Sequence, residues 1–277
     1  MTLKRYSVWM LAVTGVAAGA YWVSSALAQE QAAEANLTVD GERIANADSE
    51  PGNWLSHGRT YDEQRFSPLD QITSENIGEL SPAWVWPTQM GRGHEASPIV
   101  VDGVMFITLP WSKVAALNAA TGEVIWRYDP QVPPEKAEEA CCDVVNRGVA
   151  IWNGKVYVGT IDGRLIALDA QTGEEVWDEQ TTDPAKPYSI TGAPRIVNGK
   201  VVIGNGGAEF GVRGYMTDYD AETGEEEWRF YTVPGNPEYE FEHPELEAAA
   251  ETWNGKWWEM GGGGTAWDSM AYDPELN

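Results

Sequence analysis

The sequence predicts an all-β chain folded as a β-propeller of four-stranded antiparallel blades. The first observation is a repeat, (Asn/Asp)-Ala-x-Thr-Gly-Glu-x-x-Trp, whose three copies end at Trp126, Trp177 and Trp228. These tryptophans stand 51 residues apart, and a fixed period in this range indicates a solenoid or a propeller. The second observation is an Asp-Gly or Asn-Gly pair upstream of each copy, and the third is a set of β-branched and aromatic residues around each pair.

The Gly-containing pair comes early in each repeat unit, at residues 102–103, 153–154 and 198–199. Asp-Gly and Asn-Gly favour the two-residue turn of a β-hairpin. Strand-forming residues follow, as in Lys-Val-Tyr-Val at 155–158 and Lys-Val-Val-Ile at 200–203. Each unit therefore holds about four short antiparallel strands, which is one propeller blade.

The repeat itself is typical of a tight turn followed by a strand. Its Asn or Asp can cap its own backbone, and its Gly accepts a positive φ. Apolar residues precede the turn, as at 114–117 and 165–168, and the Trp ends the next strand, where it can pack between neighbouring sheets. An open β-solenoid is the alternative, and the Trp-bearing hairpins favour the propeller.

The third unit is longer than the others. From hairpin turn to repeat turn the first two units span 16 residues and the third spans 22. Insertions in repeat proteins map to loops on one face, which is often the binding face. The inserted residues, around 204–213, are rich in Gly, so a ligand can approach their backbone closely. Glu209 is the acid of this loop, and it is either a metal ligand or an ordinary exposed Glu.

The first 28 residues are typical of an export signal. Lys4 and Arg5 precede an apolar run over 8–23, and Ala-Leu-Ala at 26–28 gives a small-residue cleavage site. A single membrane anchor is the alternative. We expect a signal peptide over 1–28, a linker over 29–52 and a partial propeller domain over 53–277. At 51 residues per blade, the 249 residues after the signal correspond to about 4.9 blades.

The net charge of −25 comes from acidic residues that are scattered along the chain. A field of this sign argues against nucleic acid and anionic membranes as partners, and it would attract a basic protein such as a cationic cytochrome. The two cysteines, Cys141 and Cys142, are adjacent. Bridging them would close a strained ring, which tends to occur at functional sites, whereas free thiols or a bridge to another chain are the alternatives.

These residues belong to a pattern that resembles the pyrroloquinoline quinone (PQQ)-dependent alcohol dehydrogenases, from about residue 53 to 277. Four segments carry the resemblance. They are Trp-Leu-Ser-His-Gly-Arg-Thr-Tyr-Asp-Glu-Gln-Arg-Phe-Ser at 54–67, Cys-Cys-Asp-Val-Val-Asn-Arg at 141–147, Gly-Gly-Ala-Glu-Phe-Gly-Val-Arg-Gly at 206–214 and Gly-Gly-Gly-Gly-Thr-Ala-Trp at 261–267. Their order on a 51-residue repeat makes the match specific.

The resemblance implies a flat cofactor held between two platforms. A Cys141–Cys142 disulfide ring would lie on one face of the quinone, and Trp267 would stack on the other. Arg147 would donate hydrogen bonds to the quinone oxygens and polarise the reactive carbonyl. Glu95 and Thr191 would bind the polar rim.

The resemblance also implies the rest of the pocket. Thr265, Gly206, Gly207 and Ala208 would line it, and Glu209 would bind a metal ion that also touches the quinone, acting as a Lewis acid on it. The metal is calcium or a lanthanide.

The function that the resemblance implies is the oxidation of primary alcohols, or of the derived aldehydes, in the periplasm. Electrons would pass to a cytochrome c, and a haem c domain could follow in a longer chain. The family has about eight blades, so we expect this chain to be about half of the propeller, with the family's Asn metal ligand and its catalytic Asp after Asn277. We expect no stable membrane insertion after signal cleavage. A non-catalytic propeller scaffold of the outer-membrane assembly type is the alternative, and a non-functional remnant is a third reading.

Overall fold

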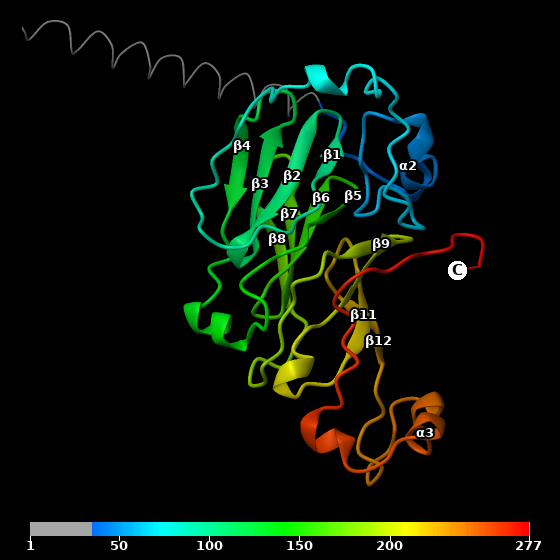
Figure 1. Ribbon diagram of the computed structural model, residues 1–277. Helices are drawn as coiled ribbons and strands as arrows, with labels where there is room; N and C mark the ends of the chain where they lie inside the picture. The colour runs from blue at the N-terminus through cyan, green and yellow to red at the C-terminus, as the bar shows by residue number, and fades with distance from the viewer. Residues whose placement is uncertain (1–34, 277) are drawn as a thin grey trace, which may run out of the picture.

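The computed structural model describes residues 35–276 and contains three antiparallel sheets of four strands (Figure 1). In every sheet the strands follow one another in chain order. The first sheet consists of β1 Ile99–Val101, β2 Val104–Leu109, β3 Lys113–Asn118 and β4 Val124–Tyr128. The second consists of β5 Ala150–Trp152, β6 Lys155–Gly159, β7 Arg164–Asp169 and β8 Glu175–Gln180. The third consists of β9 Arg195–Val197, β10 Lys200–Gly204, β11 Tyr215–Asp220 and β12 Glu226–Tyr231. The prediction of four-stranded antiparallel blades is confirmed, whereas the predicted signal peptide over 1–28 lies outside the described residues.

Apolar side chains pack between neighbouring sheets and join them. Successive side chains of a strand point to opposite faces of its sheet, so β6 serves two interfaces. Val156 and Val158 pack in a cluster that includes Phe106 of the first sheet, and Tyr157 packs in a cluster that includes Val201 of the third. The first strands, β1, β5 and β9, lie along the same side of the three sheets (Figure 1).

The hairpin turns have the predicted geometry. Asp102 and Gly103 have φ values of 46° and 84°, and the pairs at 153–154 and 198–199 also have positive φ at both residues. A type I′ turn requires positive φ at both central positions, because only then does its twist match that of the two strands. Val101 pairs directly with Val104 across the first turn. The prediction of two-residue hairpins is confirmed.

The repeat turn is closed by its first side chain. The Asn118 carboxamide oxygen accepts hydrogen bonds from the backbone N–H groups of Ala120 at 2.9 Å and Thr121 at 3.0 Å. Asp169 and Asp220 accept the equivalent pairs of bonds in the second and third sheets. The capping role predicted for this position is therefore confirmed, and it leaves the turn's remaining backbone free to contact the neighbouring sheet.

A tryptophan of one blade docks on the repeat turn of the next. The Trp126 indole N–H donates to the Ala170 carbonyl at 3.0 Å, and Trp177 donates to Ala221 at 3.2 Å. A Cβ atom on Gly173 would lie 2.6 Å from the Trp126 ring. The repeat Gly is thus required both for its positive φ and for the approach of the ring.

Trp84 makes the same contact, although no repeat turn precedes it in the sequence. Its indole N–H donates to the Ala119 carbonyl at 3.1 Å, and a Cβ on Gly122 would lie 2.4 Å from its ring. Trp84 therefore stands where the outer strand of a preceding blade would place its tryptophan. Trp228, the last copy, is 46% exposed.

The segment expected as a linker over 29–52 packs against the first two sheets where it is described, from residue 35. Leu37, Val39 and Ile44 are buried in the cluster that joins these sheets. The short helix α2, Gly41–Ala45, begins after Asp40, whose side chain accepts the backbone N–H of Arg43. This segment is part of the folded unit rather than a free connection, because its apolar side chains cover the core.

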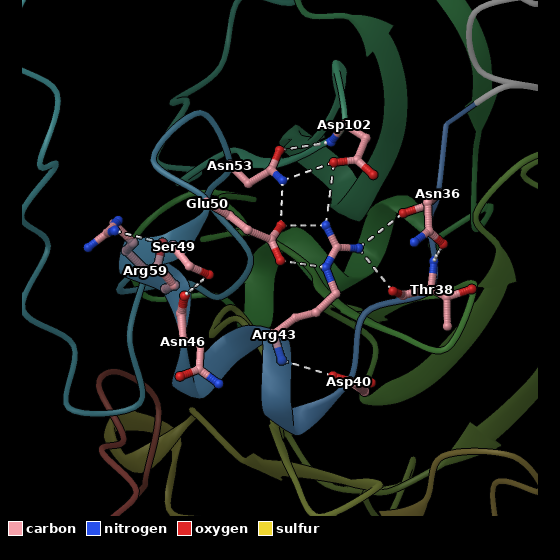
Figure 2. A network of polar contacts seen from close by, with 11 residues as sticks. Asn36, Thr38, Asp40, Arg43, Asn46, Ser49, Glu50, Asn53, Arg59 and Asp102 are labelled. Atoms are coloured by element: carbon pink, nitrogen blue, oxygen red, sulfur yellow. Dashed lines mark hydrogen bonds and ion pairs between the residues drawn. The ribbon is translucent and has the colours of Figure 1, made fainter.

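Polar contacts fasten this segment to the first hairpin (Figure 2). The Arg43 guanidinium donates to the Glu50 carboxylate at 2.9 Å and to the Thr38 carbonyl at 3.0 Å. Asn53 and Asp102 exchange two hydrogen bonds, both at 2.9 Å, so that the segment is tied to the turn between β1 and β2. Arg43 also lies 3.4 Å from the Asp102 carboxylate, which joins the two sets of contacts.

The remaining described residues form connections and short helices. The helices are η1 Ala47–Ser49, η2 Ile77–Glu79, η3 Pro110–Ser112, η4 Pro134–Glu139, η5 Ala208–Phe210, α3 Pro244–Ala250 and η6 Trp257–Met260. Within the described residues, 35–98 and 232–276 add no further sheet to these three. Between residues 35 and 276 no helix is long and apolar enough to cross a membrane.

The docking contact predicts the effect of a single substitution. Trp126→Phe keeps a flat ring but removes the N–H that satisfies the buried Ala170 carbonyl, so the free energy of unfolding should fall by about 1–2 kcal/mol. Trp228→Phe at the same repeat position should change it by less than about 0.5 kcal/mol, because that side chain is half-exposed. Urea denaturation of both variants measures the difference, and equal losses would contradict the docking role.

His57 is a buried histidine in the connection before β1. Its side chain is 6% exposed, and its Nδ1 atom has no hydrogen-bond partner among the described residues. The pKa of His57 is lowered to about 4, mainly by burial and then by the positive charge of Arg195, with a smaller effect from Arg65. The carboxylates of Glu63 and Asp268 act in the opposite direction and raise it. The ring is therefore neutral in the folded protein at neutral pH.

His57 should make stability depend on pH. Between about pH 6.5 and pH 4 the unfolded chain binds a proton at this ring and the folded chain does not, so stability is lost as the pH falls through that window. The loss should reach about 2–3 kcal/mol. Unfolding free energies of the wild type and His57→Gln, measured at pH 7 and pH 4, give the contribution of this residue, and an unchanged pH dependence in the variant would exclude it.

Candidate cofactor site

A cavity opens at one end of the sheets. The connections after the second and fourth strands of antiparallel blades emerge at the same end, and the inserted loop between β10 and β11 lies there, as predicted for a binding face. The empty space of the cavity, including its open mouth, is about 560 Å³. Its lining consists of Ala140, Cys141, Cys142, Asp143, Val145, Arg147, Ser189, Thr191, Gly206, Gly207, Glu209, Thr265 and Trp267.

Most of the predicted site residues meet in this cavity. Those that line it are Cys141, Cys142, Arg147, Thr191, Gly206, Gly207, Glu209, Thr265 and Trp267. Glu95 reaches the cavity through its ion pair with Arg147, and Ala208 begins the short helix η5 beside Glu209 without lining the cavity. Residues spread over 172 positions of the chain are thus brought to one end of the blades.

The adjacent cysteines are bonded to each other. The Cys141–Cys142 disulfide follows η4 in the long connection between β4 and β5, and both residues are exposed. Of the alternatives that the sequence left open, which were the ring, free thiols and a bridge to another chain, the structure has the ring. The ring presents a compact apolar surface at the cavity wall.

Arg147 is the centre of the polar contacts. Its guanidinium lies 3.0 Å from the Glu95 carboxylate and donates to the Thr191 hydroxyl at 2.7 Å. Its backbone N–H donates to the Thr191 carbonyl at 2.9 Å, and its own carbonyl accepts from Ser97 at 3.0 Å. Three connections of the chain are therefore joined at one positive charge.

Trp267 lies against the loops of the third blade. A Cβ on Gly204 would lie 2.2 Å from the Ala266 carbonyl, and a Cβ on Gly192 would lie 2.7 Å from the Trp267 carbonyl, so both glycines permit the approach of this segment. The Arg147 guanidinium carbon lies 4.8 Å from the centre of the Trp267 ring. The ring is 45% exposed, which leaves part of its surface free for a planar ligand.

Glu209 projects from the inserted loop. Gly207, with φ of 101°, precedes it, and a Cβ there would lie 2.5 Å from the Pro187 carbonyl. The loop is held to the preceding connection by the Gly206 N–H, which donates to the Ser189 carbonyl at 2.7 Å. Within residues 35–276 no three His, Cys, Asp or Glu side chains gather as a metal cluster, so Glu209 would supply one protein ligand among others.

Sequence reasoning missed four lining residues. Asp143 and Val145 lie within the quoted cysteine segment, and its spacing gave no reason to single them out. Ala140 precedes that segment, and Ser189 stands two residues before Thr191. The position of Asp143 directly after the cysteines was the signal that could have found it.

A family model described as "Glucose/ethanol/alcohol dehydrogenase, beta-propeller domain" and labelled PQQ matches residues 54–277. The chain belongs to the PQQ-dependent dehydrogenase family. One relative is quinohemoprotein alcohol dehydrogenase ADH IIB of Pseudomonas putida, 61% identical over 86% of this chain and 35% of the relative. This PQQ-family chain therefore spans about a third of the length of the curated relatives it matches.

Solved structures of the family superpose closely on the chain. That of quinohemoprotein alcohol dehydrogenase ADHIIG from Pseudomonas putida HK5 is 64% identical, with a TM-score of 0.85 over 87% of this chain and 36% of that one. A europium-containing methanol dehydrogenase is 37% identical, with a TM-score of 0.77 over 85% and 43% of the two chains. The blade arrangement of this PQQ-family chain is thus that of dehydrogenases in its family.

The cysteine pair can be tested by thiol titration. Protein unfolded without reductant should show no free thiol, because both sulfur atoms are in one intrachain bond. The chain should also run as a monomer on non-reducing gels, which excludes bridges between chains. After reduction, two thiols per chain should appear. Two reactive thiols before reduction would contradict the assignment.

Proposed function

We propose that this chain is the N-terminal part of a periplasmic PQQ-dependent dehydrogenase that oxidises primary alcohols or the derived aldehydes. The observation that carries the proposal is the cavity in which the disulfide, Trp267, Arg147 and Glu209 meet. Family membership favours this activity over a non-catalytic scaffold of the outer-membrane assembly type. The substrate class comes from the names of the relatives, which are alcohol dehydrogenases.

The donor set of the cavity fits a flat, anionic quinone. Such a ligand needs apolar surfaces for its faces and hydrogen-bond donors for its oxygen atoms. We assign the two faces to the Cys141–Cys142 ring and Trp267, and the polar rim to Glu95, Arg147 and Thr191. Of these three, Arg147 and Thr191 can donate to the oxygen atoms of the quinone, whereas the Glu95 carboxylate can only accept a hydrogen bond. Gly206, Gly207 and Thr265 would complete the wall, since backbone without bulky side chains allows close approach, whereas Ala208 stands behind that wall in η5.

When bound, PQQ supplies the two-electron acceptor for the alcohol. Arg147 would hold its guanidinium toward a quinone oxygen, where a fixed positive charge stabilises developing negative charge. Glu95 and Thr191 already bind that guanidinium, so its orientation is set before the ligand arrives. Such preorganisation avoids a cost of rearrangement during the reaction.

Glu209 is the proposed metal ligand. Its carboxylate oxygens suit a hard cation, for which calcium and a lanthanide are the two candidates. One carboxylate does not complete the six to eight oxygen ligands that calcium takes, so further ligands must come from the quinone, water and other residues. We place the family's Asn ligand and catalytic Asp in the part of the relatives that this chain does not cover, with a haem c domain beyond them.

The electron acceptor we propose is a cytochrome c. The net charge of −25 would speed the encounter with a basic partner by electrostatic attraction, and this effect weakens as salt is added. A periplasmic location follows from the proposed signal peptide over 1–28, ahead of the propeller domain over 53–277.

The test uses the purified chain, PQQ, and either calcium or a light lanthanide. PQQ binding should quench tryptophan fluorescence, and Glu209→Ala should abolish the strengthening of binding by metal, a change of about tenfold or more. Glu225→Ala, on the exposed repeat turn of the same blade, is the matched control and should leave it intact. Binding that does not respond to metal in the wild type would contradict the assignment of Glu209.

Turnover of the isolated chain gives a separate prediction. With a primary alcohol and an artificial dye as electron acceptor, dye reduction should not exceed that of Glu209→Ala, because the residue that removes the alcohol proton lies in the uncovered part of the relatives. Turnover well above that control would show that the catalytic base has been misplaced, or that two chains assemble into a working site.

A further inference from the structure

Asp143 ties the disulfide loop to the segment that carries Glu95. It directly follows Cys142 and has φ of 71°, a left-handed conformation that is uncommon outside Gly but that Asp adopts more readily than most residues. One carboxylate oxygen accepts a hydrogen bond from the Arg92 guanidinium at 2.9 Å, and the other accepts from the Gly93 backbone N–H at 3.2 Å. The side chain thus bridges residues that lie about 50 positions apart in the sequence.

The segment that Asp143 binds also contacts Arg147, through Glu95. The His94 ring binds the Arg92 carbonyl at 2.8 Å and the Thr88 hydroxyl at 3.0 Å, which fixes the shape of the segment. The next residue, Glu95, lies 3.0 Å from the guanidinium of Arg147. Asp143 and Arg147 stand four residues apart in one connection, so the contacts form a closed ring around the disulfide side of the cavity.

The residue after Asp143 is anchored to the blades. Val144 is buried, and its carbonyl accepts the Trp111 backbone N–H at 2.9 Å. Trp111 and Ser112 both have positive φ, 67° and 55°, and the buried Ser112 hydroxyl accepts the Ile161 N–H at 3.1 Å. Non-Gly residues in this conformation persist where surrounding contacts hold them. The exposed cysteines therefore sit at the end of a firmly held stretch, next to the Asp143 bridge.

We propose that Asp143 is a positioning residue, which clamps the Cys141–Cys142 ring to the Arg92–Gly93 segment. The clamp sets the distance between the disulfide ring and Trp267, and it aligns the ring with the Glu95–Arg147 pair. The proposal rests on the proposed function of the cavity as a quinone site. A planar ligand held between two platforms needs a gap of fixed width, since van der Waals attraction declines steeply when a contact opens by even 1 Å.

The electrostatics of Asp143 support the same role. The backbone N–H groups of Val144 and Gly93, and then the Arg92 guanidinium, hold the pKa of Asp143 below its ordinary value. The carboxylate is charged at neutral pH and accepts all of these bonds. An ordinary exposed ion pair contributes little to the stability of a protein. The experiment must therefore distinguish a clamp from such a pair.

The variants are Asp143→Ala, Asp143→Asn and Arg92→Ala, with Asp129→Asn as the matched control. Asp129 lies in the same β4–β5 connection, forms a similarly exposed ion pair with Lys113 of β3, and does not line the cavity. Arg92 is 53% exposed, so its variant tests the clamp even where Asp143→Ala fails to fold. The first measurement needs no cofactor and follows the rate at which a water-soluble phosphine reduces the disulfide.

Reduction of the disulfide should be about three- to tenfold faster in Asp143→Ala and Arg92→Ala, because the disulfide ring is no longer held. In the control, Asp129→Asn, the rate should stay within about twofold of the wild-type rate. The second measurement is PQQ affinity from tryptophan fluorescence. It should fall by about tenfold in Asp143→Ala and by less in Asp143→Asn, whose amide oxygen still accepts the Gly93 N–H. Partial rescue of PQQ affinity in Asp143→Asn is the result expected of a positioning residue. The thermal unfolding of the variants should stay unchanged, which separates this effect from a general loss of stability.

The outcomes separate the two proposals. A wild type that fails to bind PQQ, together with faster reduction in the variants, overturns the quinone site and leaves the clamp standing. A wild type that binds PQQ, with reduction rates and affinities of the Asp143 and Arg92 variants equal to those of Asp129→Asn, overturns the clamp and leaves the quinone site standing. Equal losses in Asn and Ala variants that track a lower melting temperature would show a general structural role and also overturn the clamp.

Discussion

One polar contact recurs at the junctions of this chain: an indole N–H donates to an alanine carbonyl in the repeat turn of the blade that follows. Trp84, Trp126 and Trp177 make it in succession. The turn is shaped for this contact, since its first side chain caps its own backbone and its glycine leaves room for the ring. Because both the polar edge and the flat face of the indole are used, the contact fixes the orientation of neighbouring blades as well as burying surface.

The cavity at the end of the sheets depends on that orientation. Its lining comes from connections of different blades, which emerge at the same end of the sheets. Arg147 precedes the second blade and Thr191 precedes the third, and they are joined through backbone and side chain alike. A change in the angle between the two blades would separate them, so the arrangement of the site depends on the packing between blades, to which the apolar clusters and the tryptophan contacts both contribute.

In the N-terminal part of the chain, sequence patterns did not predict which residues are buried. Residues 35–52 were expected to be a linker, yet Leu37, Val39 and Ile44 are buried against the first two sheets. Trp84 occupies a docking position without the turn that marks the other copies. Neither segment carries a repeat, and the burial of an apolar side chain outside a periodic pattern depends on a partner surface that the local sequence does not reveal.

The sequence by itself determined the blades: the 51-residue period, the type I′ hairpins, the capped repeat turns and the place of the inserted loop follow from hydrogen bonds and φ preferences within a few residues. It also supplied the candidate site residues, through the resemblance to a family. Only the tertiary structure decided that these residues converge, that Asp143 bridges to Arg92, and that the N-terminal segment covers the core. The physical reason is distance along the chain: the contacts that decide these features join residues more than about 40 positions apart, and they form only when the blades have packed against one another.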